Sequence, residues 1–262
     1  MDITHLVTIG DSFTYCQGLA DPLTQGWPIK VANHYKLPLV NLGRQGAGND
    51  SIYRRACEYL YHDLNKKSKP FFIVAFSQAW RREEWYNKHY NGTSNQCYMS
   101  LALRKEATDD YFERGVFDQW NPYSHYRNKV RLMASTIQLF KAHNIPYLIT
   151  DYANETDHKS IHKFEKTFSN MYNYVYNDKY KIFDFARLTQ NYPKTECGHD
   201  GLEAQDAVVK FVISSIDKLY GSLNVTNVVD GYPASFTSLS RFYQETEANE
   251  ATYSNVWYNN AN

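Results

Sequence analysis

The sequence has few of the features that mark membrane, secreted or disulfide-stabilised proteins. Only four of its 262 residues are cysteine, and no two of them form a Cys-x-x-Cys pair. A chain of this length does not need disulfides to hold a core, so we expect four reduced thiols. No apolar run approaches the ~18–20 residues that span a bilayer. The first ten residues lack the basic start and long apolar stretch of a signal peptide. We therefore expect a cytoplasmic protein with no membrane partner.

Neither positive nor negative charge is in excess. The chain carries 28 basic and 28 acidic residues, so its formal net charge at pH 7 is zero. Without excess positive charge there is no overall attraction to nucleic acid or anionic lipid, and we expect neither as a partner. Hydrophobic residues make up 43% of the chain, which is enough for a globular core. Aromatic residues reach 16%, with 23 tyrosines, a composition typical of wet surfaces and interfaces.

Apolar runs and helical periodicity alternate through the first 221 residues. Short apolar runs predict strands, and apolar residues at 3.6-residue spacing predict the helices between them. The predicted strands are residues 3–9, 37–42, 71–76, 145–150 and 180–185, and the predicted helices are residues 27–35, 50–64, 127–143, 157–177 and 202–220. This alternation favours an α/β domain in which an open parallel sheet is covered by helices on both faces.

Two segments depart from the alternation. Residues 85–125 are polar and rich in Tyr, Asn and Trp, so we interpret them as an insertion over one end of the sheet, either a packed lid or a surface that stacks on sugar rings. Residues 222–262 have one basic residue against four acidic ones and no clear amphipathic helix. They form either a loosely draped tail or an arm that docks on a second copy of the chain or another partner.

Polar residues that follow the predicted strands supply the candidates for chemistry, because open parallel sheets bind ligands beyond the carboxyl ends of their strands. Acyl transfer needs a nucleophile, a base, a carboxylate that orients the base, and donors for the oxyanion. Ser12 follows the first strand and is the candidate nucleophile. His199, just before the last helix, is the candidate base, and Glu196 lies three residues before it. Gly46 and Gln78 follow the second and third strands and are the candidate oxyanion donors.

The same residues carry a resemblance to the SGNH hydrolases, also called the GDSL esterase/lipase superfamily. Residues 10–12 read Gly-Asp-Ser and residues 41–46 read Asn-Leu-Gly-Arg-Gln-Gly, as in the first two blocks of that family. Residues 196–199 read Glu-Cys-Gly-His, close to the family's Asp-x-x-His. The resemblance implies a flavodoxin-like three-layer α/β/α sandwich and a serine esterase without cofactor or metal. It also implies that the Gly46 amide lines the oxyanion hole. Asp11, next to the nucleophile, is a further candidate for the oxyanion or substrate-binding site.

Two departures from the family pattern leave a second hypothesis open. The third block normally supplies an Asn after the third strand, and Gln78 stands there instead. A Gly-Asn-Asp sequence at 48–50 comes too early, so Asn49 either reaches the site or caps the helix at 50–64, which we favour. Glu196 replaces the family's Asp. The first hypothesis is hydrolysis of an ester or O-acetyl group, with a carbohydrate ester as the substrate. The second is a weak or inactive protein of the same fold with a structural or binding role.

Other features receive simpler interpretations. The Asn- and Tyr-rich composition resembles GDSL-type proteins of tailed bacteriophages, which would place the protein in the infected cell or on a virion, with residues 222–262 used for assembly. His158 and His162 have the i,i+4 spacing of metal ligands, but no third ligand is near, so we expect a solvated helix face. Residues 81–84 form a mixed charge run that we expect on an exposed rim, with contact to substrate as the alternative because the run follows the third strand. Residues 91–93 match a glycosylation sequon.

Overall fold

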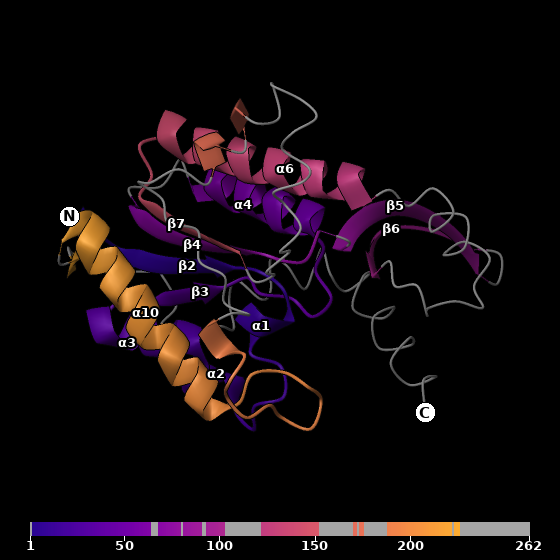
Figure 1. Cartoon of the computed structure of the whole chain (residues 1–262). Helices are drawn as coiled ribbons and strands as arrows, with labels where there is room; N and C mark the ends of the chain where they lie inside the picture. Colours follow the sequence, from indigo (N-terminus) through magenta and orange to yellow (C-terminus); the bar gives the residue numbers. More distant parts are fainter. Residues whose placement is uncertain are drawn as a thin grey trace.

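The computed structural model describes residues 2–63, 68–79, 81–90, 93–102, 122–151, 170–171, 173–175, 188–221 and 223–225. At its centre is a parallel sheet of four strands in the order β3-β2-β4-β7 (Figure 1). These strands are β2 (His5–Ile9), β3 (Leu39–Asn41), β4 (Pro70–Phe76) and β7 (Tyr147–Asp151). Helices cover both of its faces, which confirms the predicted α/β/α architecture and its flavodoxin-like strand order.

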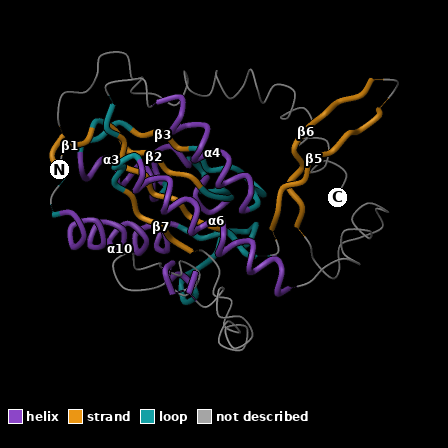
Figure 2. Tube along the Cα trace, turned by 90° about the horizontal axis from the view of Figure 1, so that it is seen from above, coloured by secondary structure: helices purple, strands orange, loops and turns teal. Residues whose placement is uncertain are grey.

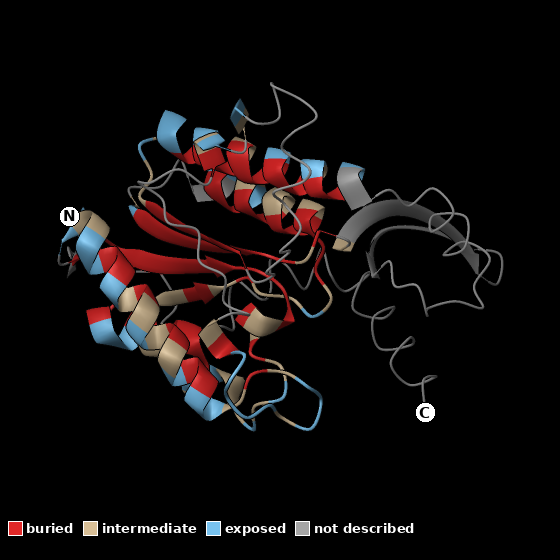
Figure 3. Ribbon diagram, in the orientation of Figure 1, coloured by how far each residue is buried: buried red, intermediate tan, exposed pale blue. Residues whose placement is uncertain are grey.

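The two faces of the sheet are buried by different helices. α4 (Asn49–Asp63) and α6 (Pro122–Ala142) cover one face, and α3 (Trp27–Tyr35) and α10 (Leu202–Tyr220) cover the other. Alternate residues of a strand point to opposite faces. Phe72 and Val74 of β4 therefore pack in the cluster under α4 and α6, and Phe71 and Ile73 in the cluster with α3 and α10. Burial on both faces explains why this strand is a continuous apolar run (Figure 3).

The order of the strands determines where a site can form. The chain passes from β2 to β3 on one side and then crosses to β4 on the other, so the direction of connection reverses at β2. Ligands of such sheets bind at this reversal, outside the carboxyl ends of the strands. Two short helices follow β2 at that end, α1 (Ser12–Tyr15) and α2 (Pro22–Gln25).

The segment after β4 differs from the prediction. We expected an irregular insertion from residue 85, but β5 (Arg81–Tyr90) and β6 (Thr93–Ala102) form an antiparallel pair from residue 81 onward. Figure 2 shows this hairpin extending beyond the helices that cover the sheet. The two strands show no regular alternation of apolar and polar residues, so the sequence pattern does not predict them. α6 starts at 122, five residues before the predicted 127.

Some predicted elements lie outside the described residues. These are the strand at 180–185 and most of the helix at 157–177, of which residues 170–171 and 173–175 are helical. Most of the extension 222–262 also lies outside them. Its first residues are described: β8 (Asn224–Val225) pairs in parallel with β1 (Asp2–Ile3). Among the described helices, none has the length and apolar character needed to cross a membrane.

A buried ion pair joins α6 to the carboxyl end of β7. Lys129 Nζ lies 2.8 Å from Asp151 Oδ1, and the two side chains are 0% and 6% exposed. Removing one partner leaves the other charge buried. We expect Lys129→Ala to lower the free energy of unfolding by about 3–5 kcal/mol in urea denaturation at pH 7. The double variant Lys129→Met/Asp151→Leu removes both charges and should recover most of that loss. A Lys129→Ala protein as stable as the parent would contradict this account.

Candidate active site

The candidate nucleophile lies on the tight turn that ends β2. Asp11 caps α1, and its Oδ1 accepts a hydrogen bond from the Phe13 N–H at 3.0 Å. Ser12 is the first residue of the helix and is 2% exposed. An Asp cap at this position satisfies a helix N–H that would otherwise lack a partner. The turn therefore holds the Ser12 hydroxyl at the carboxyl end of the central strand.

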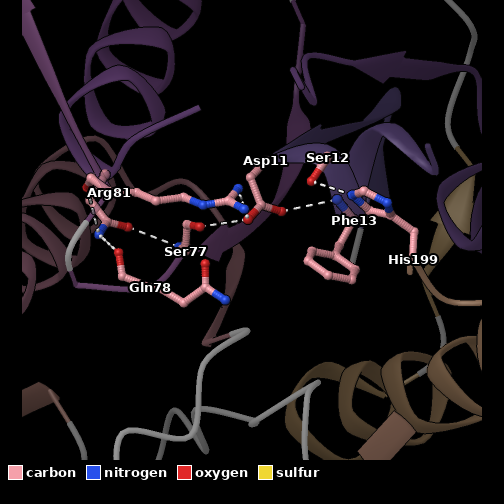
Figure 4. A network of polar contacts seen from close by, with 8 residues as sticks. Asp11, Ser12, Phe13, Ser77, Gln78, Arg81 and His199 are labelled. Atoms are coloured by element: carbon pink, nitrogen blue, oxygen red, sulfur yellow. Dashed lines mark hydrogen bonds and ion pairs between the residues drawn. The ribbon is translucent and has the colours of Figure 1, made fainter. Parts of the chain in front are cut away.

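The structure brings His199 to this hydroxyl. His199 Nε2 lies 2.9 Å from Ser12 Oγ, across 187 residues of sequence, and Figure 4 shows the two side chains pointing toward one another. The imidazole also packs against the Phe13 ring, with centroids 4.9 Å apart. This distance lies within the range for a serine whose proton is taken by a neighbouring histidine.

The loop that carries His199 is held by hydrogen bonds within it and to α10. The Thr195 N–H donates to the His199 carbonyl at 2.8 Å, and the Gly198 N–H donates to the Thr195 carbonyl at 2.8 Å. Asp200 pairs with Lys194. Gln205 of α10, which sequence reasoning missed, donates from Nε2 to the Asp200 carbonyl at 3.3 Å, and its Oε1 accepts from the Trp27 N–H at 3.0 Å. The loop is thereby tied to α10 and α3.

The surroundings of His199 favour the neutral imidazole. Burial lowers the pKa of His199 below its ordinary value of 6.5, and a backbone interaction with Cys197 raises it in opposition. Asp11 raises the pKa, Arg81 lowers it, and Asp200 raises it by a smaller amount. A neutral imidazole is the form that accepts a proton, so the shift keeps this residue ready to act as a base near neutral pH.

The glycine-rich turn after β3 lies against the nucleophile turn. A Cβ on Gly43 would come within 2.6 Å of the Tyr15 backbone nitrogen, so this close approach requires glycine. The Arg44 N–H donates to the Gly10 carbonyl at 3.1 Å, which links this turn to the end of β2. Within the described residues, neither the Gly46 N–H nor the Ser12 N–H donates a hydrogen bond. Both N–H groups therefore remain candidates for the predicted oxyanion donors.

Asn49 connects the start of α4 to the loop after β4, which is neither of its two predicted roles. It neither caps α4 nor offers its amide to a ligand. Its Oδ1 accepts from the Ser77 N–H at 2.8 Å, and its Nδ2 donates to the carbonyls of Gln78 at 2.9 Å and Arg81 at 3.4 Å. Asn49 is 2% exposed and connects the start of α4 to the loop after β4. Its side chain fixes the backbone of Gln78 and leaves no amide hydrogen for a substrate.

Gln78 itself is half-buried on that loop. Its side-chain Oε1 is buried and has no hydrogen-bond partner within the described part of the chain. The oxygen and nitrogen of a side-chain amide can exchange places by a flip about the last torsion. Gln78 therefore has a side chain whose hydrogen-bonding capacity is not used by its neighbours.

Asp11 is occupied by protein groups rather than turned toward a ligand. Its Oδ2 accepts from Ser77 Oγ at 2.5 Å and lies 3.2 Å from Arg81 Nη1, as Figure 4 shows. Asp11 is 1% exposed. The prediction that residues 81–84 form an exposed rim is wrong for Arg81, whose side chain is only 12% exposed. A mixed charge run is typical of a surface, and nothing in the sequence marks which of its residues turns inward.

The remaining predicted residues are Glu196, the carboxylate expected to orient His199, and the possible metal ligands His158 and His162. Glu196 is exposed, and within the described residues it makes no hydrogen bond or ion pair. The His199 Nδ1 instead lies 3.2 Å from Cys197 Sγ, a residue that sequence reasoning missed. The described residues contain no cluster of three His, Cys, Asp or Glu that could hold a metal ion. His158 and His162 lie outside the described residues.

The folded chain is similar to several solved structures. A member of the lipolytic protein G-D-S-L family from Veillonella parvula is 11% identical with a TM-score of 0.46, over 84% of this chain and 99% of that one. The psychrotrophic esterase EstA from Pseudoalteromonas is 13% identical with a TM-score of 0.45, over 82% and 97%. The acetyl xylan esterase Est2A from Butyrivibrio proteoclasticus is 12% identical with a TM-score of 0.46, over 84% and 66%.

Sequence comparisons add no closer relative. No protein-family profile matches the chain, and no curated protein matches it. The structural neighbours include G-D-S-L lipolytic proteins and esterases, the group that the sequence blocks resemble. At such low identities and TM-scores these neighbours do not assign an activity. The expected bacteriophage origin receives no support from these comparisons.

The network around Asp11 leads to a stability prediction. Asp11→Ala removes the cap of α1 and leaves the buried Ser77 hydroxyl and Arg81 guanidinium without this acceptor. We expect a loss of about 2–4 kcal/mol in the free energy of unfolding by chemical denaturation. Asp11→Asn keeps an oxygen for the cap and should lose less. Equal stabilities of Asp11→Ala and the parent protein would show that the network does not hold the turn.

Proposed function

We propose that the protein is a serine hydrolase that cleaves carboxylic esters. The observation that carries the proposal is the 2.9 Å contact between Ser12 Oγ and His199 Nε2 at the carboxyl end of the central strand. A serine hydroxyl is a weak nucleophile by itself, and an adjacent neutral imidazole is the group that activates it. Burial lowers the pKa of His199 and keeps the imidazole in that neutral form.

The first half of the reaction forms an acyl-enzyme. Ser12 Oγ attacks the ester carbonyl carbon as its proton passes to His199 Nε2. The negative charge that develops on the carbonyl oxygen is stabilised by the N–H groups of Ser12 and Gly46, with the Gln78 side-chain amide as a third donor. His199 then gives its proton to the leaving alkoxide as the carbon–oxygen bond breaks, and an alcohol departs.

The second half restores the enzyme. His199 takes a proton from a water molecule, and the resulting hydroxide equivalent attacks the acyl carbon. The same donors stabilise the second oxyanion, and His199 returns the proton to Ser12 Oγ as the carboxylic acid leaves. Ser12 is thus the nucleophile and His199 first the base and then the acid. An O-acetyl group on a carbohydrate remains the narrower hypothesis, based on the aromatic residues of segment 85–125.

A variant of Ser12 tests the proposal. With p-nitrophenyl acetate as substrate, we expect Ser12→Ala to lower kcat/KM by at least about 10³-fold, because the residual rate comes from binding and the oxyanion donors alone. Ser215→Ala is the matched control, because Ser215 is a buried serine of α10 whose hydroxyl donates to the Phe211 carbonyl. It should keep its rate within about twofold. Equal turnover by Ser12→Ala and the parent protein would refute ester hydrolysis at this site and favour a structural role.

The pH dependence gives a second test. The base must be neutral, and burial lowers the pKa of His199, so the acidic limb of kcat/KM should have its midpoint below pH 6.5. Arg81 lowers this pKa and Asp200 raises it. Arg81→Met should therefore move the limb to higher pH, and Asp200→Asn should move it to lower pH. Limbs that do not move, or that move the other way, would show that another group controls the rate.

A further inference from the structure

The Nδ1 atom of His199, which faces away from Ser12, lies next to the sulfur of Cys197. Cys197 Sγ lies 3.2 Å from His199 Nδ1, and Thr195 Oγ1 lies 3.3 Å from the same sulfur. A Cβ placed on Gly18 would come within 2.6 Å of this sulfur, so a side chain there would collide with it. Cys197 is an exposed residue, yet its sulfur contacts both the imidazole and a hydroxyl.

The number of protons on the hydroxyl of Thr195 and the thiol of Cys197 determines which group donates in each of these hydrogen bonds. The Thr195 hydroxyl has one proton, and it donates to the His199 carbonyl at 3.2 Å. Towards Cys197 this oxygen can only accept, so the thiol proton points to Thr195. The sulfur lone pairs are then free to accept from the imidazole. The result is a closed ring in which Nδ1–H donates to Sγ, S–H to Oγ1, and O–H back to the carbonyl of His199.

This ring selects one tautomer of the imidazole. With the proton on Nδ1, the Nε2 atom is unprotonated and faces the Ser12 hydroxyl at 2.9 Å. Only this tautomer can take the serine proton. In a serine–histidine–carboxylate triad the carboxylate fixes this tautomer, and an enzyme with the wrong tautomer has a much lower kcat. Glu196 is exposed and makes no hydrogen bond within the described residues, so it does not fix the tautomer in this structure.

We propose that Cys197 is the positioning residue of His199, so that the catalytic relay is Ser12–His199–Cys197. This inference rests on the proposed esterase function and deepens it. In this relay the sulfur only accepts a hydrogen bond from Nδ1–H, and no proton passes to it. A neutral acceptor stabilises the imidazolium less than a carboxylate does. His199 should therefore be a weaker base but a stronger acid toward the leaving alcohol than in a carboxylate triad.

Kinetics of three variants test the role. With p-nitrophenyl acetate, Cys197→Ala should lower kcat by about 10–10³-fold and leave KM within about twofold, because it disturbs orientation and not substrate binding. Cys197→Ser retains an acceptor and a donor and should recover most of the rate. Cys57→Ala removes a half-buried thiol of α4 and should have no effect. A full rate in Cys197→Ala would overturn the proposal and leave the Cys197 backbone as the orienting group. A larger loss in Glu196→Gln than in Cys197→Ala would assign the role to the carboxylate.

The tautomer provides a readout that does not depend on turnover. Nitrogen-15 NMR of the full chain should show the His199 proton on Nδ1 in the parent protein and in Ser12→Ala. Cys197→Ala should lose this preference. The same Nδ1–H signal in Cys197→Ala as in the parent would contradict the proposal. If Ser12→Ala hydrolyses ester as fast as the parent protein, the esterase function fails, while the NMR comparison still decides whether Cys197 orients His199.

Discussion

The contact between Ser12 Oγ and His199 Nε2 joins the first strand connection to the loop before the last described helix, 187 residues away. It exists because β2 lies inside the sheet and α10 packs beside α3. Gln205 links these parts directly: its amide binds the Trp27 N–H and the Asp200 carbonyl, next to His199. Any change that separates α10 from α3 would move the base away from the nucleophile before it affected either turn.

The electrostatics of the site come from two ion pairs and from burial. Arg81 pairs with Asp11 beside the nucleophile turn, and Lys194 pairs with Asp200 beside His199. Asp11 and Asp200 raise the pKa of His199 and Arg81 lowers it, so the effects of these charges oppose one another. Burial remains the largest influence and lowers the pKa of His199. The loop that carries His199 also supplies the Cys197 sulfur, while Phe13, Asp11 and Arg81 reach the imidazole from other elements.

The sequence predicts the sheet and the serine–histidine pair but not the groups that hold them. Buried parallel strands are continuous apolar runs, and motif residues at their ends meet at one edge, so Ser12 and His199 could be paired without coordinates. Arg81 and Gln205 act through contacts between distant elements, and no local pattern marks them. Cys197 contacts His199 two residues away, but a single cysteine in a loop carries no sequence signal of such a role. The hairpin of β5 and β6 did have a signal: Asn91-Gly92 stands between two ten-residue strands, and Asn-Gly is typical of a two-residue hairpin turn.

The central claim is that His199 makes Ser12 a nucleophile, and covalent labelling tests it most directly. The full-length protein is treated with diethyl p-nitrophenyl phosphate, and the modified residue is located by peptide mass spectrometry. We predict one diethylphosphoryl group on Ser12 in the parent protein, with labelling slowed by at least about 10²-fold in His199→Ala. Labelling at the same rate in both proteins, or on a residue other than Ser12, would contradict the account.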